Sequence, residues 1–74
     1  MRTTLHLLKG APGAALAAIE RQHREPHTSV TVVLLHGAPT PSLPRGVAVW
    51  HVPGDLGYGA LLELIFESDQ VIAW

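Results

Sequence analysis

Histidine, a side chain that can serve as an acid, a base or a metal ligand, is enriched in this sequence. There are five among 74 residues: His6, His23, His27, His36 and His51. His36 and His51 each stand at the end of a predicted strand, and Asp55 follows His51 by four residues. Open α/β sheets bind ligands at the carboxyl edge of their strands. Two imidazoles and a carboxylate at that edge are able to bind a divalent metal or a small anion.

This ligand site depends on whether the two strands that end at His36 and His51 are neighbours. No local ligand motif such as HExxH supports it, and a histidine at a strand end commonly hydrogen-bonds a loop carbonyl instead. A stand-alone, homo-oligomeric module that binds a metal or a small ligand through His36, His51 and Asp55 is therefore our alternative hypothesis. Under our main hypothesis we expect no resident metal or cofactor. His23 and His27 are separated by Pro26, which breaks the helix between them.

The absence of cysteine narrows the chemistry further. Zinc–thiolate sites, iron–sulfur clusters and thiol nucleophiles all need that side chain. The sequence also lacks a G-x-S-x-G nucleophile turn and a G-x-G-x-x-G dinucleotide motif. We therefore expect a protein that is not an enzyme.

The amino-acid composition limits the kinds of partner that we expect this protein to bind. The chain is 47% hydrophobic and 15% charged, with a net charge of −1. So few cations cannot neutralise a row of phosphates, so we expect no direct nucleic-acid binding. No apolar run approaches the ~20 residues that span a bilayer, and we expect a cytoplasmic protein. A domain of this size buries a thin core and often oligomerises.

The pattern predicts alternating strands and helices. Strands are expected over Thr3–Leu8, Ser29–His36, Val47–Val52 and the closing Gln70–Trp74, with helices over Ala11–Glu25 and Leu56–Ser68. The run Val30–Leu35 is apolar almost throughout, which is typical of a strand buried on both faces of a parallel sheet. The order β-α-β-β-α-β predicts a single α/β domain over 1–74, a small three-layer sandwich with a mainly parallel four-stranded sheet. The short, proline-rich link between the second and third strands leaves their pairing open, parallel or antiparallel.

The last helix is apolar on more sides than one small domain can cover. Leu61, Leu62, Leu64, Ile65 and Phe66 leave only a narrow acidic stripe at Glu63 and Glu67. A surface helix normally has a single apolar face. We therefore expect one side of this helix to pack on the sheet and another to meet a neighbouring subunit. The predicted interface residues are Tyr58, Leu61, Leu64, Ile65, Phe66 and Trp74.

Three stretches resemble the TusB/DsrH family of sulfur-relay subunits. They are the opening "TLHLL", the third strand "VAVWHV", and the closing "YGALLELIFESDQVIAW", which ends in Ala73-Trp74. Members of that family typically close with a tyrosine-led apolar helix and a short strand ending in Ala-Trp. This sequence is shorter than is usual for the family, with the segments on either side of the third strand reduced.

The resemblance implies a DsrE-like fold assembled with DsrE/DsrF-type (TusD/TusC-type) subunits, with itself, or with both. Such complexes pass persulfide sulfur between proteins, for 2-thiolation of the tRNA wobble uridine or in oxidative sulfur metabolism. A chain without cysteine cannot carry a persulfide itself. The resemblance therefore implies a non-catalytic structural or docking subunit.

Overall fold

A computed structural model describes residues 1–10 and 13–74. Its elements follow the predicted order: β1 (Arg2–Leu8), α1 (Ala14–His23), β2 (Thr28–Leu35), β3 (Ala48–Val52), α2 (Tyr58–Glu67) and β4 (Gln70–Ala73). The expected α/β class and β-α-β-β-α-β order are confirmed. The bounds of most elements differ from the prediction by one or two residues. Ala11 and Pro12, predicted to open the first helix, lie outside the described residues.

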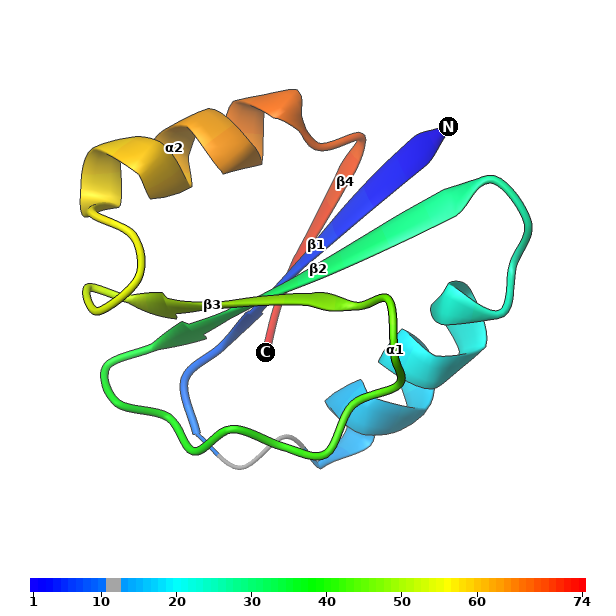
Figure 1. Ribbon diagram of the computed structural model, residues 1–74, viewed down its shortest axis with the longest axis horizontal. Helices are drawn as coiled ribbons and strands as arrows, with labels where there is room; N and C mark the ends of the chain where they lie inside the picture. Colours follow the sequence, from blue (N-terminus) through cyan, green and yellow to red (C-terminus); the bar gives the residue numbers. More distant parts are fainter. Residues whose placement is uncertain (11–12) are drawn as a thin grey trace.

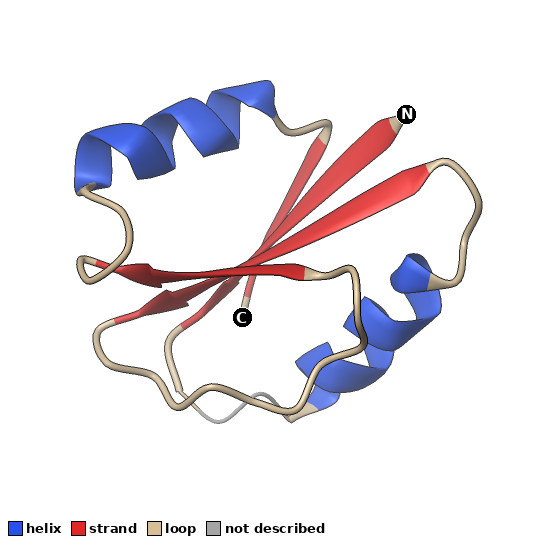
Figure 2. Ribbon diagram, in the orientation of Figure 1, coloured by secondary structure: helices blue, strands red, loops and turns tan. Residues whose placement is uncertain are grey.

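The four strands form one sheet in the order β3-β2-β1-β4, and every neighbouring pair is parallel. The pairing that the sequence left open is thereby decided, since β2 and β3 are parallel neighbours with Leu34 opposite His51. Figure 2 shows that a loop, rather than a helix, connects these two strands. Ala38 and Leu43 of that loop pack into the core, so the loop covers the part of the sheet that a helix would otherwise cover.

Each face of the sheet carries one helix (Figure 1). On one face, α1 buries Ala15 and Ile19 against strand residues such as Val32. Pro26 follows α1 shortly after its end, as expected of a residue that cannot continue a helix. On the other face, α2 buries Leu61 against Leu5, Val33 and Val52. The central strands β1 and β2 are therefore covered on both sides.

Both helical connections move across the sheet in the right-handed sense (Figure 1). The chain goes from β1 through α1 to its neighbour β2, and from β3 through α2 to the opposite edge at β4. α2 thus lies against β1, with β4 on one side of it and β3 on the other. Among the described residues, no helix is both long and apolar enough to cross a membrane.

Candidate functional site

A turn after β3 folds the carboxylate of Asp55 back onto His51. The backbone N–H groups of Asp55 and Leu56 both donate to the carbonyl of His51, at 2.7 and 3.1 Å. Asp55 Oδ2 in turn accepts from the backbone N–H of His51 at 2.9 Å and lies 3.0 Å from its Nδ1. The backbone hydrogen bond, followed by the side-chain one, lowers the pKa of Asp55 from its ordinary value. Asp55 therefore stays ionised and holds the proton of His51 on Nδ1.

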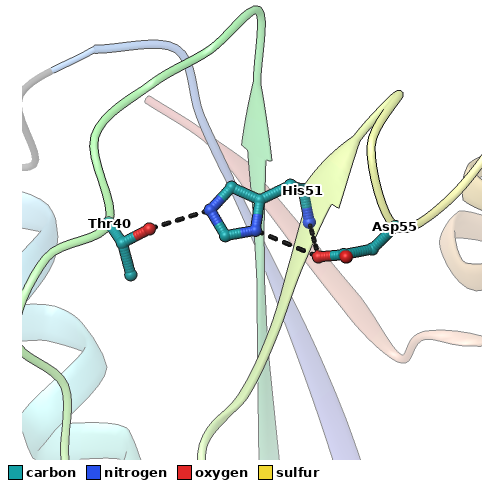
Figure 3. Close-up of polar contacts among 3 residues, drawn as sticks. All are labelled: Thr40, His51 and Asp55. Atoms are coloured by element: carbon teal, nitrogen blue, oxygen red, sulfur yellow. Dashed lines mark hydrogen bonds and ion pairs between the residues drawn. The ribbon is translucent and has the colours of Figure 1, made fainter.

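The other imidazole nitrogen of His51 faces Thr40 in the β2–β3 loop. Thr40 Oγ1 lies 2.8 Å from His51 Nε2 (Figure 3). With Nδ1 protonated, Nε2 has a free lone pair, so the hydroxyl donates to it. The result is a chain of hydroxyl, imidazole and carboxylate at the carboxyl edge of the sheet. The sequence pointed to His51 and Asp55 but not to Thr40, which no motif marks.

Hydroxyl, imidazole and carboxylate stand in the same order as in nucleophilic hydrolases. Such enzymes also need N–H donors for the oxyanion, one of them commonly from the residue after the nucleophile. Here that residue is Pro41, which has no N–H. No pocket is found in the part of the chain that the structure describes. These hydrogen bonds connect the proline-rich loop to β3, and we call Thr40, His51 and Asp55 the clasp.

His36 takes no part in this cluster. It and Gly37 have φ angles of 53° and 73°, and Ala38 N–H donates to the carbonyl of Leu35 at 3.0 Å. These are the features of a tight turn with both central residues in the left-handed region, where histidine is enriched among non-glycine residues. Within residues 1–10 and 13–74, no group of three or more His, Cys, Asp or Glu side chains is placed to hold a metal ion.

The remaining surface histidines also have local structural roles. His27, with φ of 61°, occupies a left-handed turn before β2, and its carbonyl accepts from the backbone N–H of Arg2 at 2.7 Å. His23 ends α1 beside Gly46, where an added Cβ would come within 3.1 Å of the His23 ring. Gly46 has φ of 94°, so this position favours glycine for both its space and its backbone.

His6 is fully buried in the middle of the sheet, and both of its nitrogens are hydrogen-bonded. Its Nε2 lies 2.6 Å from Gln22 Oε1 on α1, and Trp74 Nε1 donates to its Nδ1 at 2.9 Å. The two rings are nearly parallel, at 14° to each other, with centroids 6.0 Å apart. Burial lowers the pKa of His6, and the Gln22 hydrogen bond opposes that shift only in part. The histidine is thus held neutral, with its proton on Nε2.

Trp74, a predicted interface residue, is held by its own chain. Besides the bond to His6, its backbone N–H donates to the carbonyl of Leu7 at 2.9 Å. The Trp74 ring and Gln22 of α1 both hydrogen-bond to His6. The Trp74 ring therefore lies on the α1 face of the sheet, opposite α2. Trp74 therefore does not belong to the surface that α2 presents.

The other predicted interface residues divide between the core and the surface. Leu61 is buried in the chain's own core, and Leu64 and Ile65 pack against that core. Tyr58 and Phe66 are 55% and 83% exposed, and Leu62 between them is 54% exposed. The sequence prediction did not include Leu62, although its spacing of four from both aromatic residues places the three in one row.

The exposed row lies on the β4 side of α2. Each residue turns a helix by about 100°, so Leu62 points about a quarter-turn away from the buried Leu61. Because α2 runs antiparallel to the strands in a right-handed crossover, that quarter-turn leads toward β4. Val71 of β4 lies opposite Leu5 on the same face of the sheet and is 38% exposed. We call Tyr58, Leu62, Phe66 and Val71 the apolar step.

Comparison of this chain with protein-family models, with curated proteins and with solved structures finds no match.

Proposed function

We propose that the protein is a non-catalytic docking subunit of a sulfur-transfer complex, and that the apolar step is its subunit interface. The complex would serve 2-thiolation of the tRNA wobble uridine or oxidative sulfur metabolism. The observation that carries the docking role is the row of three large apolar side chains on α2, of which Phe66 is 83% exposed. A contiguous exposed apolar surface beside a strand edge is typical of a protein–protein contact.

The sulfur-relay part of the proposal is supported by the family resemblance of the opening strand and of Tyr58–Trp74. With no cysteine in the sequence, the persulfide would be carried by the DsrE-type or DsrF-type partners. This chain would contribute a rigid α/β body whose own core is closed by α1 on one face and α2 on the other.

A mixing experiment with defined partners tests this function. The protein would be combined with DsrE-type and DsrF-type subunits of the same genome, and the mass measured by light scattering after size exclusion. We expect the wild-type chain to form a mixed complex. Phe66→Asp should lower the affinity of that complex at least tenfold, because the aspartate would place a charge in an apolar contact. Ala60→Asp is the matched control, since Ala60 is exposed on the opposite side of the same helix.

The expected control result is a mixed complex of unchanged affinity. Absence of any mixed complex with the wild-type chain would exclude the sulfur-relay role. A mixed complex that Phe66→Asp leaves intact would show that the apolar step is not the interface.

A further inference from the structure

We infer that the apolar step and the free edge of β4 together form a two-fold contact between two copies of this chain, in which the two β4 strands pair antiparallel. This inference rests on the proposed role of the apolar step as a subunit interface. It names a second copy of this chain as the occupant of that surface when no other subunit is present, so a DsrE-type partner would compete with the second copy. It would join two four-stranded sheets into one continuous sheet.

β4 is an edge strand that carries none of the side chains that usually block pairing. It lies last in the strand order, with β1 on one side and no described strand on the other. Edge strands of soluble proteins are usually blocked by short length, lysine, proline, inward-pointing charge or a covering segment. β4 is short, with four residues, so any pairing there involves few hydrogen bonds. Gln70–Ala73 has the sequence QVIA, which contains none of these residues. The edge is therefore chemically suited to accept another strand.

The outward main-chain groups of β4 can be assigned from its bonds to β1. In a parallel ladder, alternate residues bond to a given neighbour. Trp74 N–H donates to Leu7, so the groups that face β1 belong to the even-numbered positions. The N–H and C=O groups of Val71 and Ala73 consequently face the free edge.

These two residues define a symmetric register. In an antiparallel pair, residues that exchange both hydrogen bonds stand directly opposite each other. Placing Val71 opposite Ala73 of the second copy, and Ile72 on the two-fold axis, satisfies all the outward groups of both strands with about four hydrogen bonds. The contact is thus self-complementary at the level of the main chain.

The same symmetry brings the two α2 helices together. The two-fold axis is perpendicular to the sheet, so both helices lie on the same face of the joined sheet. Three strand spacings separate the two β1 strands by about 14 Å. Each α2 lies against its β1, and a helix with its side chains is about 10–12 Å across. Large side chains such as Phe66, directed toward β4, therefore reach across the axis.

Charge favours a second copy over a partner of opposite charge. Glu63 and Glu67 follow Leu62 and Phe66 by one residue, which turns them outward and away from β4. The carboxylate of Asp69 accepts from the backbone N–H of Thr3 at 2.7 Å and so is already hydrogen-bonded. The apolar step contains no charged side chain for a basic or acidic partner to pair with. It matches another uncharged step of the same kind.

The contact is small, which sets its expected strength. The four side chains of the apolar step leave on the order of 400 Å² accessible in each copy, about half of the ~800 Å² per partner in a standard interface. Main-chain pairing at β4 adds to this. We expect a dimer with a dissociation constant on the order of micromolar.

Two double variants of the full chain test both the contact and its register. Sedimentation equilibrium should show a concentration-dependent dimer for the wild-type protein. Val71→Lys with Ala73→Lys places like charges opposite each other and should weaken dimerisation at least tenfold. Val71→Lys with Ala73→Glu places lysine opposite glutamate across the axis, and should restore much of the affinity at low salt and less at high salt. Both positions are exposed, so the core is unchanged.

Amide hydrogen exchange gives a second measurement on the unmodified protein. Protection of the Val71 and Ala73 N–H groups should rise with protein concentration, while that of Ile72, which faces β1, should not. A wild-type protein that remains monomeric at millimolar concentration would overturn the inference. Dimerisation of unchanged affinity in the Val71→Lys, Ala73→Lys variant would also overturn it. Equal affinities of the two double variants would do the same.

These failures can be told apart from failure of the proposed function. A chain that is monomeric alone but binds DsrE-type subunits through Phe66 would overturn the two-fold contact and leave the docking function standing. A dimer that binds neither DsrE-type nor DsrF-type subunits would do the reverse.

Discussion

The carboxyl end of β3 and the outer side of β4 lie at opposite edges of one sheet. They differ in whether their exposed groups have interaction partners within the chain. At β3, His51 has hydrogen-bond partners on both ring nitrogens and on its backbone N–H. At β4, the main-chain edge is open and the adjoining helix row is exposed and apolar. β3 is also an edge strand, but the exposed groups of His51 at its carboxyl end have partners within the chain, whereas the apolar row beside β4 remains exposed.

This contrast shows why residue chemistry alone is a poor guide to function here. His36, His51 and Asp55 suggested a site for a metal or a small anion, but in the structure His51 hydrogen-bonds to Asp55 and to Thr40 of the loop that connects β2 to β3. The apolar residues of α2 were expected to serve both the core and a subunit interface, and the structure leaves Leu62 and Phe66 exposed. The region with incomplete interactions is the better candidate for binding a partner.

The largest expected effect separates two neighbours on α2. Leu61→Ala removes a side chain of α2 that is buried against strand residues of the core and should lower the free energy of unfolding by about 2–5 kcal/mol. Leu62→Ala truncates an exposed side chain and should change it by less than ~0.5 kcal/mol in dilute solution. Urea denaturation followed by circular dichroism measures both.

Protein concentration sharpens that comparison. Because a dimer stabilises its folded subunits by mass action, Leu62→Ala should become more destabilising as the concentration rises, whereas the effect of Leu61→Ala should persist at every concentration. Equal effects of the two substitutions in dilute solution would contradict the division between buried and exposed sides of α2.

The next largest expected effect is the pH dependence of the free energy of unfolding caused by the buried His6. Its pKa is lowered in the folded state, so between that value and the unfolded 6.5 the unfolded chain binds more protons. The stabilisation is therefore fully present above pH 6.5 and is lost as the pH falls below it, at a slope of up to ~1.4 kcal/mol per pH unit. Protonation at Nδ1 would also remove the acceptor for Trp74. Unfolding free energies measured from pH 7.5 to 5 should show this slope.

His6→Gln is the test of that assignment, because glutamine has no ionisable group in the pH range. The variant should be less stable at pH 7.5, since the Trp74 and Gln22 contacts are altered, but its stability should vary less between pH 6.5 and 5. An unchanged pH slope would assign the effect to other groups.

Much of the fold could be predicted from the sequence because strand and helix periodicities are local. The apolar run Val30–Leu35 correctly indicated a central strand of a parallel sheet. The β2–β3 pairing could not be predicted, because it depends on how a helix-free loop packs Ala38 and Leu43 against the sheet. The partner of His51 was missed for the same reason, since Thr40 reaches it only through that loop's path.

The interface itself stays a prediction, but burial divides its residues in a way that the sequence does not show, for a different physical reason. Composition shows that a helix is apolar on several sides but not which side the sheet covers. Leu61 was assigned to the interface and is in the core, and Leu62 was not assigned and is exposed. The handedness of the crossover and the position of β4 decide this, and both are properties of the whole sheet.

A smaller effect is expected at the clasp. Thr40→Val keeps the shape of the side chain and removes the hydroxyl that donates to His51. A hydrogen bond of this kind contributes about 0.5–1.5 kcal/mol, and this one is exposed, so the loss should fall at the lower end. Hydrogen exchange in residues 36–47 should accelerate more than in β1. Thr40→Ser keeps the hydroxyl and is the matched control; equal acceleration in both variants would contradict the clasp.

The smallest effect lies in the carboxylate of the same clasp. The pKa of Asp55 is held below its ordinary 3.8, first by the His51 backbone N–H and then by the His51 side chain. Because the folded pKa is the lower one, the resulting stabilisation is present above pH 3.8 and is lost as the pH falls through the folded value. In an NMR titration of the carboxyl carbon, His51→Ala should raise the pKa of Asp55 only part of the way to 3.8, since the backbone donor remains. A pKa that His51→Ala leaves unchanged would show that the imidazole does not bind this carboxylate in solution. The polar edge would then lack the internal partner that distinguishes it from β4.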